Sequence, residues 1–421
     1  MDAKLIVDEV RLTPILISDP PLLNNQGVHQ PYTPRLVVEV VTRGGVSGLG
    51  ETYGDTVYLD LARPLAEALP GRSITDVNSL FALAEEAGGA PHSDTDEGVD
   101  ASGLRGVRTA EKLRLSVVSA FETACLDALG KTLGLPVHAL LGGKVRDEVE
   151  YSAYLFHKWA GTDEWGAALD PAGIVAQARR FDRAYGFRSF KLKGGVFAPE
   201  REIAAIRALA EAFPGRPLRL DPNGAWSVET SLAVARELED VLEYLEDPAS
   251  GTAEMAAVAA GTDVPLATNM CVTTFEEVPE AFAKGAVRIV LCDHHYWGGL
   301  HRTRELAALC RTYGVGLSMH SNTHLGISLA AMTQVAATLP GLHHACDTHY
   351  PWQTEDVVTR RPVFQEGRVR VSDGPGLGVE LDRGALSALH RRWLEDDGTH
   401  RDRDDTAAMR ATNPTWTRDH W

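Results

Sequence analysis

Short runs of apolar residues alternate with longer amphipathic stretches over the second half of the chain. Each run has the length of a buried strand. The runs are 151–156, 187–192, 217–220, 241–245, 265–267, 287–291, 314–319 and 343–346. Helical periodicity separates most of them, at 172–185, 199–213, 227–240, 274–284, 299–313 and 325–338. Strands and helices that alternate in this way predict an α/β fold, a (β/α)8-type barrel.

The first part of the chain has a different pattern. Strand-like segments at 5–17, 35–41 and 46–51 predict an antiparallel meander, and helical periodicity follows at 58–70, 76–87 and 112–134. The glycines of 44–50 lack the Gly-Lys-Ser/Thr of a phosphate loop and indicate a hairpin instead. Two stretches rich in Gly and polar residues, 18–34 and 88–106, predict long loops that are functional or disordered.

Composition limits the possible partners and the compartment. The formal net charge of -17 argues against nucleic acid and anionic membranes as partners. Five scattered cysteines without metal-type spacing suggest reduced thiols. The N-terminus has no apolar signal region, and no run of about 18 apolar residues occurs. We therefore expect a cytoplasmic protein.

Lys191 and Lys193 lie two residues apart in one of the apolar runs. Residues i and i+2 of a strand point to the same face, so the two ammonium groups would be neighbours. Each would make ionisation of the other costlier, which predicts that the pKa of at least one is lowered towards that of a working base. An edge strand with two solvated lysines is the alternative.

Polar residues follow the later apolar runs at the same point of each repeat. One such residue is common, because strands often end in Asp or Asn for turn reasons. Repetition in phase favours a site, since catalytic groups of a barrel stand at the C-terminal ends of its strands. After the two lysines, the set continues with Asp221, Glu246, Thr268 and Asn269, Asp293, His320 to Asn322, and Asp347 to His349.

At these residues the chain resembles the enolase superfamily, and within it the acid-sugar dehydratases, closest to the glucarate dehydratases. The matching segments are FKLKGGV (190–196), LDPNGAW (220–226), EDP (246–248), ATNM (267–270), HSN (320–322), DTH (347–349) and PGLGVE (375–380). The resemblance implies an N-terminal α+β capping domain (1–138), a modified TIM barrel (139–380) and a C-terminal segment (381–421) that completes the cap. It also implies one Mg²⁺. Separately, we expect the protein to form a homo-oligomer.

The resemblance assigns roles that the residue types can fill. Asp221, Glu246 and Asn269 would be oxygen ligands for Mg²⁺. Lys193 would be the base that removes the proton α to a carboxylate, and Lys191 would contact that carboxylate. His320, oriented by Asp293, would act on the opposite side and supply the acid for loss of the β-hydroxyl. His294 and His295 are not expected to be metal ligands, because neighbours on a strand point opposite ways.

The resemblance also nominates substrate contacts outside this set. Arg403 lies in a charged run (402–405) whose default interpretation is a solvated tail. The nominated residues are His29, Thr109, Tyr154, Asn223, Asn322, His349 and Arg403.

Three functions compete. The first is a hydro-lyase of carbohydrate catabolism that dehydrates an acid-sugar dicarboxylate, D-glucarate or a stereoisomeric hexarate. The second is a racemase or epimerase of the same superfamily. Its lysine-dependent branch would require a Lys at position 293, where this chain has Asp. The third is a non-catalytic paralogue, which is disfavoured because no catalytic position has been lost.

Overall fold

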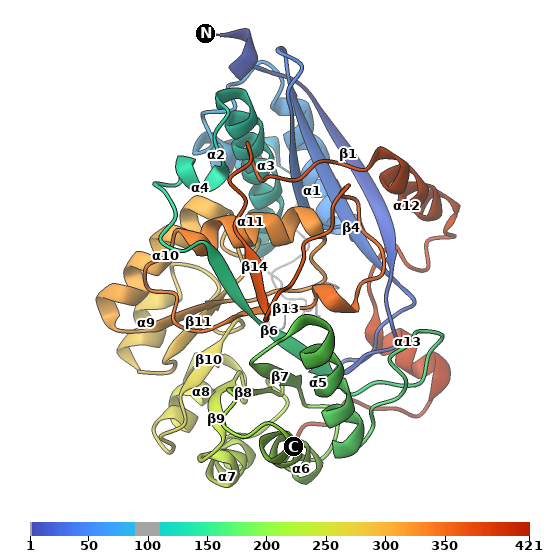
Figure 1. The fold of residues 1–421 in the computed structure, drawn as a ribbon, viewed down its shortest axis with the longest axis vertical. Coiled ribbons are helices and arrows are strands. Elements are labelled where there is room, and N and C mark those ends of the chain that lie inside the picture. Colours follow the sequence, from blue (N-terminus) through green and yellow to red (C-terminus); the bar gives the residue numbers. More distant parts are fainter. Residues whose placement is uncertain (1, 89–109) are drawn as a thin grey trace.

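A computed structural model describes residues 2–88 and 110–421 of the chain (Figure 1). Three antiparallel strands in the order β1-β4-β5 form the N-terminal sheet: β1 (Val7–Ser18), β4 (Tyr32–Thr42) and β5 (Ser47–Tyr53). The turn between β4 and β5 has Gly45 at φ 78°, a conformation that glycine adopts without steric cost. The hairpin predicted for the glycines of 44–50 is therefore confirmed.

Helix α3 (Ala110–Leu133) packs against β5, and small residues allow the close approach. A side chain at Gly50 would collide with the backbone carbonyl of Ala120. The other helices of this part are α1 (Thr56–Ala68), α2 (Ser79–Ala87) and α4 (Val137–Leu140), after a 3₁₀ turn η1 (Ala3–Leu5). The loop predicted for 18–34 is ordered as a small hairpin of β2 (Leu23–Asn24) and β3 (Gly27–Val28).

Eight parallel strands form the central sheet in the order β12-β11-β10-β9-β8-β7-β6-β13. The barrel is nearly closed, because a parallel bridge joins Leu317 on β12 to Leu342 just before β13. These strands are β6 (Glu148–Phe156), β7 (Phe190–Lys193), β8 (Leu218–Asp221), β9 (Leu242–Glu246), β10 (Leu266–Thr268), β11 (Ile289–Cys292), β12 (Gly316–Met319) and β13 (Cys346–Thr348). All eight predicted runs overlap strands of one barrel, the last of them (343–346) only at Cys346.

Helices separate the barrel strands, as the amphipathic pattern predicts. One of them, α8 (Gly251–Ala259), was missed because its apolar and Ala-rich sequence has no polar face to reveal a period. The others are α5 (Pro171–Tyr185), α6 (Pro199–Ala212), α7 (Val228–Leu238), α9 (Val278–Ala283), α10 (Leu300–Tyr313) and α11 (Gly326–Ala337).

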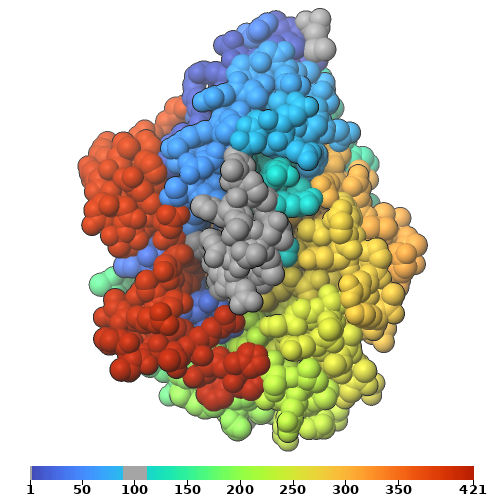
Figure 2. Space-filling model, turned by 180° about the vertical axis from the view of Figure 1, so that it is seen from behind, coloured from blue at the N-terminus to red at the C-terminus, as the bar shows by residue number. Residues whose placement is uncertain are grey.

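After the barrel the chain returns to the N-terminal sheet. It passes through η2 (Tyr350–Trp352) and β14 (Arg368–Arg370), which pairs with β6, and then forms α12 (Arg383–Glu395) and α13 (Asp405–Thr412). The ring of His390 on α12 lies 2.7 Å from the carbonyl of Pro14, and Thr406 on α13 donates to Gln26 at 2.7 Å. In Figure 2 this C-terminal segment (red) lies beside the N-terminal part (blue) and extends to the green part of the barrel.

Two further predictions concern helices and thiols. Within residues 2–88 and 110–421, none of the helices combines the length and apolar character needed to cross a membrane. The five cysteines are buried and form no disulfide.

Candidate active site

The two lysines of β7 stand among carboxylates at one end of the barrel. Lys191 Nζ lies 2.8 Å from Asp347 Oδ2 and 3.5 Å from Asp221 Oδ2, and it also contacts Glu246. Lys193 Nζ donates to Asp221 Oδ2 at 2.5 Å. Both side chains are buried, so the alternative of an edge strand with solvated lysines is excluded.

The environment of Lys191 raises its pKa, so Lys191 is not the lysine whose pKa the sequence predicts to be lowered. Burial lowers the pKa, but Asp347, Glu246 and Asp221 together outweigh burial, and the net pKa is raised. Repulsion between the two ammonium groups, on which the sequence prediction rested, lowers the pKa less than the attraction of three nearby carboxylates raises it. Both ammonium groups also lie over the ring of Tyr154, at 4.9 Å and 5.2 Å from its centre.

Three oxygen-bearing side chains lie at the ends of neighbouring strands. Asp221 and Glu246 end β8 and β9, and Asn269 follows β10. Glu246 Oε1 and Asn269 Oδ1 are buried and accept no hydrogen bond from the described residues. Burial, and then the charge of Asp221, raise the pKa of Glu246 well above its ordinary value. A hard divalent cation would offset both effects, so this oxygen-only set fits Mg²⁺.

His320 and Asp293 form a hydrogen-bonded pair at the ends of β12 and β11. His320 Nδ1 lies 3.2 Å from Asp293 Oδ2, and both side chains are buried. Burial lowers the pKa of His320, although Asp293 opposes that shift. The ring of Tyr154 lies 6.5 Å from that of His320 and also contacts Lys193. Tyr154 therefore lies near both predicted bases.

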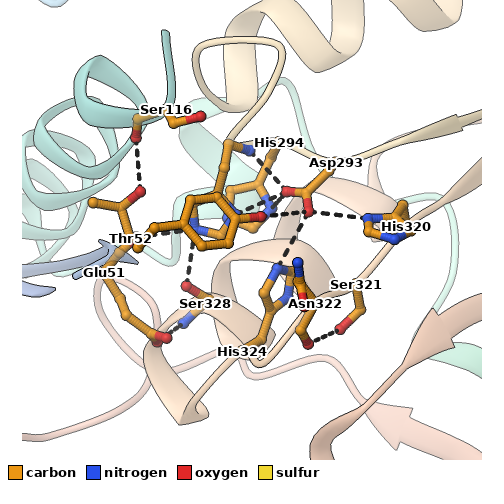
Figure 3. A network of polar contacts seen from close by, with 12 residues as sticks. Glu51, Thr52, Ser116, Asp293, His294, His320, Ser321, Asn322, His324 and Ser328 are labelled. Carbon is orange, nitrogen blue, oxygen red and sulfur yellow. Dashed lines mark hydrogen bonds and ion pairs between the residues drawn. The ribbon is translucent and has the colours of Figure 1, made fainter. Parts of the chain in front are cut away.

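More residues surround Asp293 than the sequence suggested. Figure 3 shows its carboxylate among His294, His320 and His324. The prediction that His294 and His295 point opposite ways is wrong: their ring centres lie 4.0 Å apart. Strand β11 ends at Cys292, so the alternation of a strand does not extend to these residues. The sequence signal that could have indicated these additional neighbours is the pair of adjacent histidines directly after the aspartate at the end of the strand.

A second polar group lies where the N-terminal hairpin meets the C-terminal segment. The rings of His29 and His349 stack with their centres 6.1 Å apart, and His29 Nδ1 lies 3.1 Å from Asp19 Oδ2. Arg403 is buried and donates two hydrogen bonds to Asp405, at 3.0 Å and 3.1 Å. The solvated-tail interpretation of Arg403 is therefore wrong.

Charge in this second group is balanced internally. The nearby Asp19 carboxylate has its pKa lowered, because His29 outweighs the effect of burial. His349 has its pKa lowered to about 3, chiefly by burial, and neither of its ring nitrogens has a hydrogen-bond partner among the described residues. A neutral ring with free nitrogens beside a buried guanidinium is suited to bind an oxygen-rich anion.

The remaining nominated residues take different positions. Asn223, at φ 53°, donates its side-chain amide to Asp221 Oδ1 at 2.6 Å and so holds that carboxylate. Tyr154 donates to Asp347 at 3.2 Å. Asn322 uses its Oδ1 to accept the backbone N–H of Thr323 at 3.1 Å.

Thr109 lies outside the described residues.

Comparison with known proteins decides the family. Residues 173–385 match the enolase C-terminal domain-like family, and residues 20–142 match the mandelate racemase / muconate lactonizing enzyme N-terminal domain. The chain belongs to the enolase superfamily. It is 71% identical over 424 aligned residues to a probable glucarate dehydratase of Streptomyces coelicolor, covering 99% of this chain and 98% of that relative. The resemblance and the fold class predicted from the sequence are thus confirmed.

Solved structures support the same assignment. An enolase from Thermobispora bispora, complexed with magnesium and formate, is 53% identical with a TM-score of 0.94, covering 99% of this chain and 100% of that one. An enolase from Pseudomonas fluorescens, with bound magnesium, potassium and tartrate, is 45% identical with a TM-score of 0.94, covering 98% of each chain. The dehydratase name of the Streptomyces relative agrees with the predicted hydro-lyase class.

Proposed function

We propose that this enolase-superfamily protein is a Mg²⁺-dependent hydro-lyase that dehydrates an acid-sugar dicarboxylate, D-glucarate or a stereoisomeric hexarate. One observation carries the proposal. A set of oxygen ligands, a lysine pair and an Asp–His pair converge at the C-terminal ends of consecutive strands of one barrel. The probable glucarate dehydratase of Streptomyces coelicolor and the tartrate-bound structure of Pseudomonas fluorescens support the choice of a diacid.

The first step is removal of the proton α to a carboxylate. Asp221, Glu246 and Asn269 would hold Mg²⁺, whose positive charge would offset the negative charge that develops as the proton leaves. Lys191, whose pKa is raised, stays protonated and adds a second positive charge there. Lys193, at the end of β7, takes the α-proton on Nζ from a substrate of one configuration.

His320 serves the other face and the second step. Its lowered pKa leaves the ring neutral at physiological pH, with Nδ1–H directed to Asp293 and Nε2 free to take a proton. His320 first takes up a proton at Nε2, which is the α-proton itself where His320 is the base and a solvent proton where Lys193 is the base. As the carbon–oxygen bond at the β-position breaks, His320 gives that proton to the leaving hydroxide. Water departs, and the enol becomes a 2-keto-3-deoxy acid sugar.

The distal carboxylate of a diacid needs its own binding group. A carboxylate that is buried without a cation costs on the order of several kcal/mol, because it loses its hydration and gains no partner. Arg403 and the two stacked rings of His29 and His349 supply such a group at the junction of the N-terminal hairpin and the C-terminal segment. We propose that they bind the distal carboxylate.

Epimerisation is the second candidate, and one observation favours it. Lys193 and His320 both lie beside Tyr154, so two bases border the same space. Proton removal by one and return by the other would invert the α-carbon. We place this as a side reaction, since His320 is also available as the acid that dehydration requires.

A stereochemically complete panel of hexarates tests the proposal. Each diacid and its matching aldonate is incubated with the protein and Mg²⁺, and 2-keto product is measured; an excess of chelator is the control. We expect product from at least one diacid, and none in chelator. Absence of product from every diacid in the presence of Mg²⁺ would refute the proposed function.

A further inference from the structure

The two oxygens of the Asp293 carboxylate have separate partners. Oδ1 lies 2.8 Å from His295 Nδ1 and accepts the backbone N–H of the same residue at 3.0 Å. Oδ2 faces His320 at 3.2 Å, with Tyr53 at 3.4 Å and His324 at 3.6 Å. His295 therefore binds one oxygen from two directions, and the other oxygen remains for His320.

The ring of His295 is itself fixed from its far side. Its Nε2 lies 3.0 Å from the carbonyl oxygen of Glu51 on β5 and 3.1 Å from Ser328 Oγ on α11. The ring is fully buried and cannot turn without losing contacts at both nitrogens. Its neighbour His294 differs, because His294 Nδ1 is 3.9 Å from Asp293 and has no hydrogen-bond partner among the described residues. His295 thus joins the N-terminal sheet to Asp293.

We propose that His295 is a positioning residue for the Asp293–His320 pair, which it serves by fixing Asp293 Oδ1 so that Oδ2 meets His320 Nδ1. This inference rests on the proposed function, because the effect on catalysis passes through His320.

The physical reason is rotation of the carboxylate. A carboxylate held at one oxygen can turn about its Cβ–Cγ bond and offer either oxygen to a neighbour. Four histidines and a tyrosine surround the Asp293 carboxylate, so several groups compete for its two oxygens. With Oδ1 held, the Nδ1–H form of His320 is favoured, and its Nε2 keeps a lone pair for the substrate. Burial raises the pKa of Asp293, but the neighbouring histidines lower it further, and His295 contributes most to this lowering. Asp293 therefore stays ionised.

Two substitutions at His295 separate its two contacts. In His295→Asn the amide nitrogen can occupy the place of Nδ1 and still donate to Asp293. In His295→Gln the amide lies one bond farther, near the place of Nε2, and meets Glu51 and Ser328 instead. The two variants are alike in polarity, which makes each a control for the other in folding. His294→Gln is the matched control for a buried histidine without the hydrogen bond.

The first measurement is the rate of solvent deuterium exchange at the α-carbon. It is made separately for the epimer whose proton Lys193 removes and for the epimer whose proton His320 removes. For His295→Gln we expect exchange from the epimer served by His320 to fall about tenfold to a hundredfold, as for other lost partners of a functional histidine. Exchange by Lys193 should be unchanged. His295→Asn and His294→Gln should both retain the His320-side rate. Equal losses from both epimers, or an undiminished His320-side rate in His295→Gln, would overturn the proposal.

The second measurement needs no substrate. Ring-¹⁵N histidine NMR reports the tautomer of each imidazole, and His320→Asn identifies the signal of His320. We expect the Nδ1–H form in the unchanged protein and in His295→Asn, and a mixture of tautomers in His295→Gln. An unaltered His320 tautomer in His295→Gln would overturn the proposal. If the wild-type protein incorporates no solvent deuterium into any acid sugar, the proposed function fails. The NMR result still decides the role of His295.

Discussion

Replacement of Arg403 by alanine should remove the preference for a diacid over a monoacid. The Arg403 side chain is buried, only 7% exposed, and its positive charge acts on the ring of His349, which stacks with His29. A hexarate would bring its second carboxylate to this group, whereas the matching aldonate has no charge there. Binding energy from a remote group of this kind is used at the reacting carbon, so kcat/KM is the quantity to compare.

The magnitude follows from the partners of Arg403. Truncation of one member of a buried, hydrogen-bonded charge pair costs about 2–5 kcal/mol. The lower half of that range applies here, because Asp405 already balances part of the guanidinium charge through two hydrogen bonds. A loss of about 2–3 kcal/mol corresponds to about a 30- to 150-fold fall in kcat/KM for the diacid. The aldonate should change little.

Two companion variants separate recognition from stability. Arg403→Ala leaves Asp405 buried with Asn24 as its remaining side-chain hydrogen-bond donor among the described residues, at 2.7 Å. Adding Asp405→Asn removes that unpaired charge, so it should restore the melting temperature but not the preference for a diacid. Arg401→Ala is the control in the same segment, since Arg401 packs on Trp393 instead. Equal losses for diacid and aldonate in Arg403→Ala would refute the reasoning.

Three further results are expected. Activity should vanish in chelator and return with Mg²⁺, and Asp221→Asn should abolish both the activity and calorimetric Mg²⁺ binding, because a charged ligand is lost. His320→Asn should stop dehydration but retain Lys193-dependent deuterium exchange into one epimer, measured by NMR; undiminished dehydration would exclude His320. Glu243 has its pKa held at about 2, since Arg219 and His344 outweigh burial, so its stabilising effect is complete above pH 4.5 and is lost as the pH falls towards 2. Glu243→Gln should therefore lower the free energy of unfolding by about 3 kcal/mol at pH 7 and by little near pH 2, as measured with urea.

The sequence determined the barrel and the main members of its candidate site. Each strand is a short apolar run, and the polar residue that ends it is a local feature of the chain. In a parallel barrel the C-terminal ends of the strands lie together, so local positions such as Asp221 and His320 imply a shared site. The lysine pair of β7 was predictable for the same reason, since alternation along a strand fixes which side chains are neighbours.

The tertiary structure alone decided the electrostatic environment. The pKa of Lys191 is raised because Asp347 and Glu246, distant in sequence, lie against it. The run containing Arg403 is polar enough for a solvated tail, yet α13 packs on the N-terminal hairpin, and Asn24 bonds to Asp405 across 381 positions of sequence. The same holds for His295, whose partner Glu51 lies 244 positions away. Burial and charge balance depend on such long-range contacts, and a local pattern of residues carries no information about them.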